Sequence, residues 1–189
     1  MSAGAGTWLP LAAQAMSTRK ASDGEEALIE RREQLVAPMQ AGEKPAERWR
    51  IGTEHEKLVF ARADHHAPSY EEPGGIRDML LELQQFGWEP VVEGGNVIAM
   101  SGADGTVSLE PAGQLELSGA PLENLHQTCA ETGRHLKQVK AIGEKSNTGF
   151  LGLGMWPDKR REDLPVMPKG RYAIMLRHMP RVGTMGLDM

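Results

Sequence analysis

The sequence predicts an α+β fold, in which neighbouring antiparallel strands pack against helices. Residues 89–118 have the alternation and turn residues of several short strands. Apolar residues at helical spacing precede them at 75–86 and follow them at 121–145. No internal repeat is visible. Strands grouped between helices, without strict alternation of strand and helix, are typical of α+β domains.

The size and charge of the chain narrow the function classes. Its 189 residues fit one domain, and its formal net charge of −5 argues against a broad basic surface for a nucleic acid. No apolar run reaches the roughly 18 residues that a membrane span needs. The single cysteine, Cys129, allows no internal disulfide, which is typical of a reducing compartment such as the cytoplasm. We therefore expect neither a nucleic acid nor a membrane as partner.

The N-terminal region is expected to contain a leader and one helix. Residues 1–22 begin with small, apolar side chains and lack the basic start of a secretory signal, so we expect a disordered leader before a domain at 23–189. Residues 23–39 place apolar side chains among charges at helical spacing and predict an amphipathic helix that packs at the domain edge. These apolar side chains are Leu28, Ile29, Leu35 and Val36.

The next segments predict a strand, a loop and a helix. Residues 48–60 contain aromatic and β-branched side chains and predict a strand. Residues 61–73, with two histidines and two prolines, predict a loop. The helix expected over 75–86 ends at Gly87, because glycine readily adopts the left-handed conformation that follows a helix.

Antiparallel strands are expected between residues 89 and 118. Residues 96–100 and 106–110 flank Gly102-Ala103-Asp104-Gly105, a good hairpin turn. A further short strand, at 114–117, follows the Pro-Ala-Gly break. The side chains that alternation places on the core side are Val107, Leu109, Leu115 and Leu117.

The C-terminal part is expected to contain a long helix, a short strand and a last helix. Residues 121–145 predict the long helix, with Pro121 at its first position and Cys129 as a buried, inert thiol. Residues 150–155 predict the strand, and 171–179 the last helix. The side chains expected on the buried stripe of the long helix are Leu122, Leu125, Cys129, Leu136, Val139 and Ile142.

Two acidic runs contain the main functional signal. Glu54 and Glu56 lie two residues apart in an expected strand, so they point to the same face. Glu110, Gln114 and Glu116 share one parity and face together if the Pro-Ala-Gly segment keeps the pleat. Carboxylates on one face repel each other, and such oxygen ligands suit Mg²⁺ or Mn²⁺. On spacing alone, a metal site and a solvated strand face are equally good interpretations.

A basic segment precedes the last helix. In Lys169-Gly170-Arg171, backbone N–H groups at a helix start and a cation can together hold an anion. Arg171 is therefore a candidate to bind a carboxylate or phosphate, with a solvated loop as the alternative. Two other motifs are incomplete: the residues around His55 do not form His-Glu-x-x-His, and residues 143–146 lack the upstream glycine of a phosphate-binding loop.

These segments resemble the signatures of a known family, the glutamate–cysteine ligases of the plant and proteobacterial type. The likeness begins with Arg50-Ile51-Gly52-Thr53-Glu54-His55-Glu56-Lys57 and continues through 108–122, 125–129, 167–172 and 179–189. It covers roughly residues 24–189. The sequence departs from the family pattern at Ala112, where a glycine is usual, and at Leu58-Val59-Phe60, which replaces a more aromatic Phe-Gly-Phe.

The resemblance implies an ATP-dependent ligase that joins the γ-carboxyl of glutamate to the amine of cysteine, through a γ-glutamyl phosphate, in the first step of glutathione synthesis. It also implies a fold like that of glutamine synthetase, with a curved antiparallel sheet, outer helices, Mg²⁺ and ATP. A plant-like host would make an organelle an alternative to the cytoplasm. Carried over by motif, the metal ligands are Glu54, Glu56, Glu110 and Glu116, the nucleotide-binding residues are Gln114 and Lys169, and the catalytic residue is Arg171.

Family members are expected to continue past residue 189. The resemblance therefore implies that this chain is the N-terminal portion of the catalytic domain, incomplete in fold and inactive by itself. Two alternatives stay open. One is a related carboxylate–amine ligase with another amine substrate, and the other is a metal- or nucleotide-binding module without catalysis.

Overall fold

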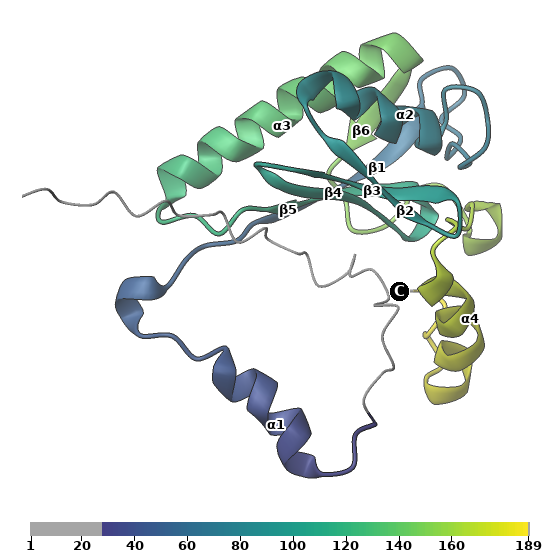
Figure 1. Cartoon of the computed structure of the whole chain (residues 1–189). Helices are drawn as coiled ribbons and strands as arrows, with labels where there is room; N and C mark the ends of the chain where they lie inside the picture. Colours follow the sequence, from purple (N-terminus) through teal and green to yellow (C-terminus); the bar gives the residue numbers. More distant parts are fainter. Residues whose placement is uncertain (1–27, 189) are drawn as a thin grey trace, which may run out of the picture.

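A six-stranded antiparallel sheet organises residues 28–188, the part of the chain that this computed structural model describes (Figure 1). Its strand order is β2-β3-β4-β5-β1-β6. The α+β prediction is therefore confirmed, whereas the expected leader at 1–22 lies outside the described residues. Among the described helices, none has the length and apolar character needed to cross a membrane. The strands are β1 (Glu54–Ala61), β2 (Glu89–Glu93), β3 (Asn96–Gly102), β4 (Gly105–Glu110), β5 (Gln114–Gly119) and β6 (Thr148–Leu151).

The hairpin expected at 102–105 is present. β3 pairs with β4, with Gly102 opposite Gly105. Gly105 has a φ of +109°, and a Cβ there would lie 2.2 Å from the Ser118 carbonyl oxygen, so this turn requires glycine. The strand expected at 48–60 begins only at Glu54: Ala46–Arg48 form a short 3₁₀ turn, η1, and between the turn and the strand Ile51 makes only an isolated bridge, with Leu122.

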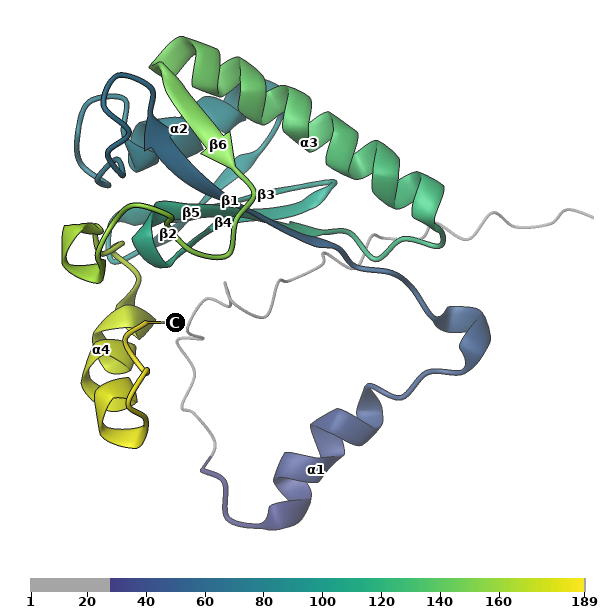
Figure 2. The ribbon, with the colours of Figure 1, turned by 180° about the vertical axis from the view of Figure 1, so that it is seen from behind.

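The helices α2 (Ile76–Glu82) and α3 (Leu125–Ser146) cover one face of the sheet (Figures 1 and 2). α2 continues into the 3₁₀ turn η2, and Gly87 ends this turn at a φ of +87°, as predicted. α4 lies on the other side of the sheet, near its end. The helices are α1 (Arg32–Ala41), α2 (Ile76–Glu82), α3 (Leu125–Ser146) and α4 (Gly170–Val182), and the other 3₁₀ turns are η2 (Leu83–Phe86), η3 (Pro111–Gly113) and η4 (Arg161–Asp163).

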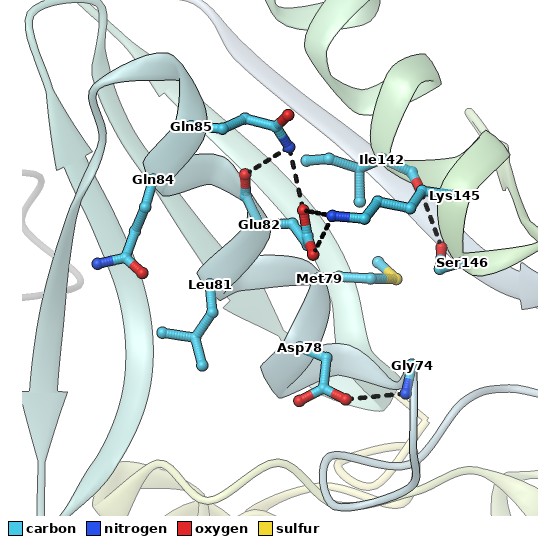
Figure 3. A pocket seen from close by; sticks show the side chains of 10 residues that line it. All are labelled: Gly74, Asp78, Met79, Leu81, Glu82, Gln84, Gln85, Ile142, Lys145 and Ser146. Atoms are coloured by element: carbon cyan, nitrogen blue, oxygen red, sulfur yellow. Dashed lines mark hydrogen bonds and ion pairs between the residues drawn. The ribbon is translucent and has the colours of Figure 1, made fainter.

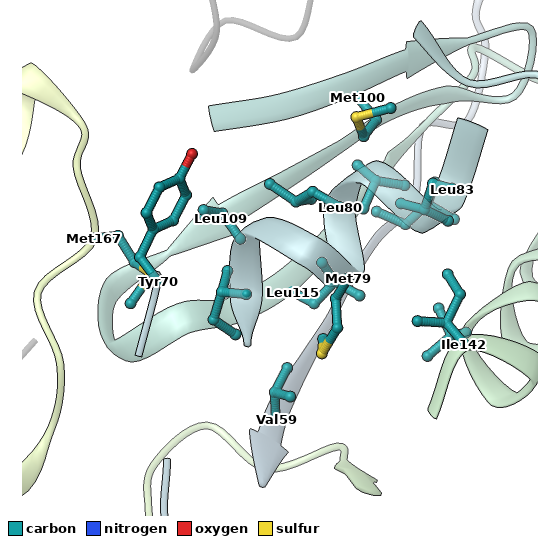
Figure 4. Close-up of a cluster of buried hydrophobic side chains, with 14 of the residues drawn as sticks. Val59, Tyr70, Met79, Leu80, Leu83, Met100, Leu109, Leu115, Ile142 and Met167 are labelled. Carbon is teal, nitrogen blue, oxygen red and sulfur yellow. The ribbon is translucent and has the colours of Figure 1, made fainter. Parts of the chain in front are cut away.

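The hydrophobic core fills the space between the sheet and α2 and α3 (Figure 4). The four core residues predicted from strand alternation are all buried, with at most 3% of each exposed. Ile76, Leu80 and Leu83 extend the core from α2 and η2. Burying such side chains contributes about 1.5–3 kcal/mol each, which fixes the position of the sheet that carries the site.

The buried stripe expected on α3 is partly wrong. Val139 and Ile142 are buried, but Leu125 is 71% exposed and Cys129 is also exposed, so the prediction of a buried thiol at Cys129 is wrong. The inward positions nearer the start of the helix belong to the polar residues Glu131 and His135. These residues lie eight and four positions before Val139, and therefore share its face of the helix. Pro121 does not begin the helix, because Asn124 caps it instead.

The first helix also differs from its prediction. α1 begins at Arg32, so Leu28 and Ile29 lie outside it. None of the side chains of α1 is buried, and the helix stands away from the sheet in both views (Figures 1 and 2). Without Leu28 and Ile29, the apolar stripe of the helix is short, and the described part of the chain offers it no packing surface.

Candidate functional site

The acidic residues of β1, β4 and β5 lie on one face of the sheet, opposite α2 and α3. In the register of the strands, Glu56 lies directly opposite Glu116, and Glu54 lies opposite Ser118. Glu110 lies opposite Gln114 across the turn η3. Cross-strand partners point to the same side of a sheet, so the expected shared orientation is confirmed. We call this surface the acidic face, and it consists of Glu54, Glu56, Glu110, Gln114 and Glu116.

Glu116 lies at the centre of the acidic face and is only 6% exposed. The hydroxyl of Ser118 donates a hydrogen bond to its Oε1 at 2.5 Å. Burial raises the pKa of Glu116, and the nearby charges of Glu110 and Glu54 raise this pKa further. Gln114 donates from Nε2 to Glu56 Oε2 at 3.0 Å, which orients the carboxylate opposite Glu116. A bound cation would relieve the repulsion among these carboxylates.

Cations from the start of α4 neutralise one edge of the acidic face. Arg171 Nη2 lies 2.8 Å from both carboxylate oxygens of Glu110. Lys169 Nζ lies 3.5 Å from the same carboxylate and donates to the carbonyl of Leu109. The Arg171 guanidinium also lies over the ring of Tyr172, 5.3 Å from its centroid. The structure therefore brings Lys169, Arg171 and Glu110 together, although they are about 60 positions apart in the sequence.

The donor set of the acidic face suits a hard divalent cation. Glu54, Glu56 and Glu116 offer carboxylate oxygens, which Mg²⁺ prefers, whereas Glu110 already has two cationic partners. Within residues 28–188, no group of three or more His, Cys, Asp or Glu side chains is close enough together to hold a metal ion. Mg²⁺ usually retains waters and binds through one or two carboxylates together with substrate phosphates. The carboxylates of β1 and β5 fit that kind of site.

A largely apolar cavity of about 390 Å³ adjoins the acidic face. Leu58 lines it and follows Glu56 by two positions, so it continues the same face of β1. Gln114 also lines the cavity, and so connects it with the carboxylates. Trp156 and Tyr172 contribute aromatic rings on the side of α4. A ligand with one charged and one apolar end would suit this junction.

Figure 3 shows another cavity, of about 550 Å³, between α2 and the end of α3. Lys145 Nζ lies 2.6 Å from both carboxylate oxygens of Glu82, and Asp78 accepts a hydrogen bond from the backbone N–H of Gly74. None of the expected site residues lines this cavity. Since two of its acidic groups have partners within the chain, this cavity is a weaker candidate than the acidic face.

Three buried polar residues behind the acidic face were not predicted from the sequence, whereas the strand parity of His55 correctly placed it on the side of β1 away from Glu54 and Glu56. Lys57, Glu131 and His135 are each at most 2% exposed, and His55 contacts Lys57. Burial lowers the pKa of Lys57 to about 8 and the pKa of His135 to about 3. Two signals in the sequence could have found them. Lys57 shares the strand parity of Val59, and Glu131 and His135 share the helix face of Val139.

Comparison with known proteins gives one consistent result. Residues 50–189 match a family model described as Glutamate-cysteine ligase family 2. The chain is 53% identical over 159 residues to glutamate–cysteine ligase A, chloroplastic, of Oryza sativa subsp. japonica, and 51% identical over 158 residues to the chloroplastic glutamate–cysteine ligase of Arabidopsis thaliana. Each alignment covers 84% of this chain, but 32% of the rice protein and 30% of the Arabidopsis protein. The chain thus spans about a third of the length of these relatives.

Proposed function

Because the chain belongs to glutamate-cysteine ligase family 2, we propose that it forms part of an ATP-dependent ligase that joins the γ-carboxyl of glutamate to the amine of cysteine. This reaction is the first step of glutathione synthesis. The observation that carries the proposal is the acidic face, where Glu56 and Glu116 lie opposite each other in a chain similar to plant glutamate–cysteine ligases. Paired carboxylates beside a cavity suit a ligand that brings both a cation and phosphates.

The side chains of the acidic face would bind the cation, and those at the start of α4 would bind an anionic group. Glu56 and Glu116, with Glu54 two positions away on β1, would hold Mg²⁺ through one or two carboxylates at a time against the phosphates of ATP, and Gln114 orients Glu56 through its hydrogen bond. When bound, the cation neutralises the negative charge on the transferring phosphoryl group. Arg171 and Lys169 would hold a substrate carboxylate or a phosphate, with Glu110 fixing the direction of the guanidinium.

The proposal extends to the fold around the site, the substrates and the cellular compartment. The sheet would form one wall of a curved, glutamine synthetase-like site, with glutamate, cysteine and ATP as substrates. The chain spans about a third of its relatives, so we expect the 189 residues alone to lack turnover. The compartment would be the cytoplasm or an organelle, the latter supported by the chloroplastic relatives.

A chimera tests the activity. Residues 50–189 would replace the matching segment of the Arabidopsis ligase, and ADP release would be measured with glutamate, with cysteine and with both. We expect ADP only when both are present. Glu56→Gln and Glu116→Gln should each lower kcat/KM by at least about tenfold, since each removes a proposed ligand. Glu144→Gln, at an exposed position of α3, is the matched control.

Other outcomes would favour the two alternatives. If an amine other than cysteine supports ADP release more efficiently, the chain belongs to a ligase with a different amine substrate. If the chimera folds and binds Mn²⁺ and ATP but never releases ADP, the binding-module alternative is favoured and the ligase proposal fails.

A further inference from the structure

A group of polar residues, most of them buried, lies where α3 covers β1 and the end of β5, behind the acidic face: His135 meets His55 of β1, and Glu131 Oε1 accepts a hydrogen bond from the backbone N–H of Ala120, directly after β5. We call it the polar layer, and it consists of His55 and Lys57 of β1 and Glu131 and His135 of α3. Three of the four are at most 2% exposed. Further along the same helix, Val139 and Ile142 make apolar contacts with the core. The change from apolar to polar packing therefore occurs where β1 presents Glu54 and Glu56 on its other side.

Lys57 holds the backbone of β1 at this point. Its Nζ lies 2.8 Å from His55 Nδ1 and donates to the carbonyl oxygen of His55 at 2.7 Å. Both contacts span the single residue Glu56. The ring of His55 in turn lies edge to face against the ring of His135, with 6.4 Å between the centroids. Rotation of the strand around Glu56 would break these contacts.

The polar layer is a poor arrangement for stability. Burial of an ammonium group costs free energy, and an apolar side chain of similar volume often packs at least as favourably. Within the described residues, Glu131 Oε2 and both ring nitrogens of His135 are buried without a hydrogen-bond partner. Each such group carries the unfavourable free energy of desolvation without a hydrogen bond to offset it. A role in positioning accounts for Lys57 better than a role in stability does.

We propose that Lys57 is a positioning residue, which holds His55 and the backbone of β1 so that Glu54 and Glu56 face Glu116 for binding of a divalent cation. This inference rests on the proposed function, because it assumes that the acidic face binds the cation. Ligand groups need placement to within about 0.5 Å, and the residues that support them set that precision. The acidic face receives such support from the contacts of Lys57 on the opposite side of the strand.

The test compares Mn²⁺ binding with stability in the 189-residue chain. Free Mn²⁺ would be followed by electron paramagnetic resonance, and the free energy of unfolding by urea titration. Lys57→Met should weaken Mn²⁺ binding about tenfold and leave the free energy of unfolding equal or higher. His55→Phe should weaken Mn²⁺ binding similarly. The double variant should bind no more weakly than either single variant, because both changes remove the same contact between Lys57 and His55. Lys137→Met, at an exposed position of α3, should change neither quantity.

Three results would overturn the proposal. If Lys57 acts only through its charge, Lys57→Met removes a cation near the site and Mn²⁺ binds more tightly. If Lys57 only fills space, binding is unchanged. If Lys57→Met does not unfold cooperatively, His55→Phe decides, and normal Mn²⁺ binding in that variant refutes the positioning role. The proposed function fails separately, and this inference with it, if the wild-type chain shows no Mn²⁺ binding that Glu116→Gln removes.

Discussion

Among the single residues of the site, the carboxylates have unequal surroundings. Glu110 has Arg171 and Lys169 as partners, whereas Glu116 receives one hydroxyl and faces other carboxylates. The parity of the strands was sufficient to predict that these side chains share a face. It could not predict the cationic partners of Glu110, because the contact between α4 and β4 joins residues 61 positions apart.

Glu116→Gln should stabilise the metal-free protein. Burial raises the pKa of Glu116, so its charged form is unfavourable in the folded state, and an amide of the same shape removes the charge. We expect the free energy of unfolding to rise while Mn²⁺ binding weakens at least about tenfold. Urea titration without metal measures the first effect. A loss of stability would contradict this account of Glu116.

Ala112→Gly should also stabilise the chain. Ala112 has a φ of +62°, in the left-handed region that a Cβ disfavours by about 1–2 kcal/mol. Glycine relieves this strain but gains entropy when unfolded, so the net increase should be about 0.5 kcal/mol. Ala99→Gly, in the buried part of β3, provides the opposite control and should destabilise. Equal losses at both positions would show that the turn η3 is not strained.

His135 should make the stability depend on pH. Burial lowers its pKa to about 3, with smaller contributions from Lys57 and His55 of β1, and Glu131 lies one turn away on α3. The unfolded chain therefore binds a proton that the folded chain does not, so stability is full above about pH 6.5 and falls as the pH falls. Between about pH 7 and pH 5 the loss should be about 2 kcal/mol.

His135→Leu identifies this contribution. Urea titrations at both pH values should show the loss in the wild type and a smaller one in the variant. The same pH dependence in both proteins would contradict a neutral, buried His135.

At the scale of elements, strands were predicted better than helices. Alternation fixed the core side of β4 and β5, since one face of each strand is fully covered. The stripe of α3 was predicted from apolar residues alone, and this failed because Glu131 and His135 occupy inward positions. Helical spacing specifies which residues share a face, but not which face meets the sheet. The polar layer could therefore not be predicted until the packing of α3 on the sheet was known.

The start of α3 provides a test at this scale. Asn124 Oδ1 accepts hydrogen bonds from the backbone N–H groups of His126 and Gln127, each at 3.1 Å. Asn124→Ala should therefore lower the free energy of unfolding by about 1 kcal/mol. Pro121→Ala should change it much less, because Pro121 lies outside the helix. Equal effects of the two substitutions in urea titrations would contradict the assigned cap.

At the scale of the whole molecule, one face of the sheet forms the hydrophobic core and the other carries the candidate site. α2 and α3 cover one face and form the core, and the other face presents the carboxylates with α4 at its edge (Figures 1 and 2). The pairing of β1 with β5 brings Glu56 opposite Glu116, 60 positions later in the chain. Strand order cannot be read from periodicity, so the spacing of the two acidic runs left a metal site and a solvated strand face equally good, and the resemblance to a family favoured the metal site.

The most direct test of this account is Mn²⁺ binding to the 189-residue chain, measured by electron paramagnetic resonance. Wild type would be compared with Glu56→Gln, Glu116→Gln and the exposed control Glu144→Gln. We predict binding that both substitutions on the acidic face weaken at least about tenfold and that the control retains. Equal Mn²⁺ binding in all four proteins, or none in the wild type, would contradict a divalent-cation site on the acidic face.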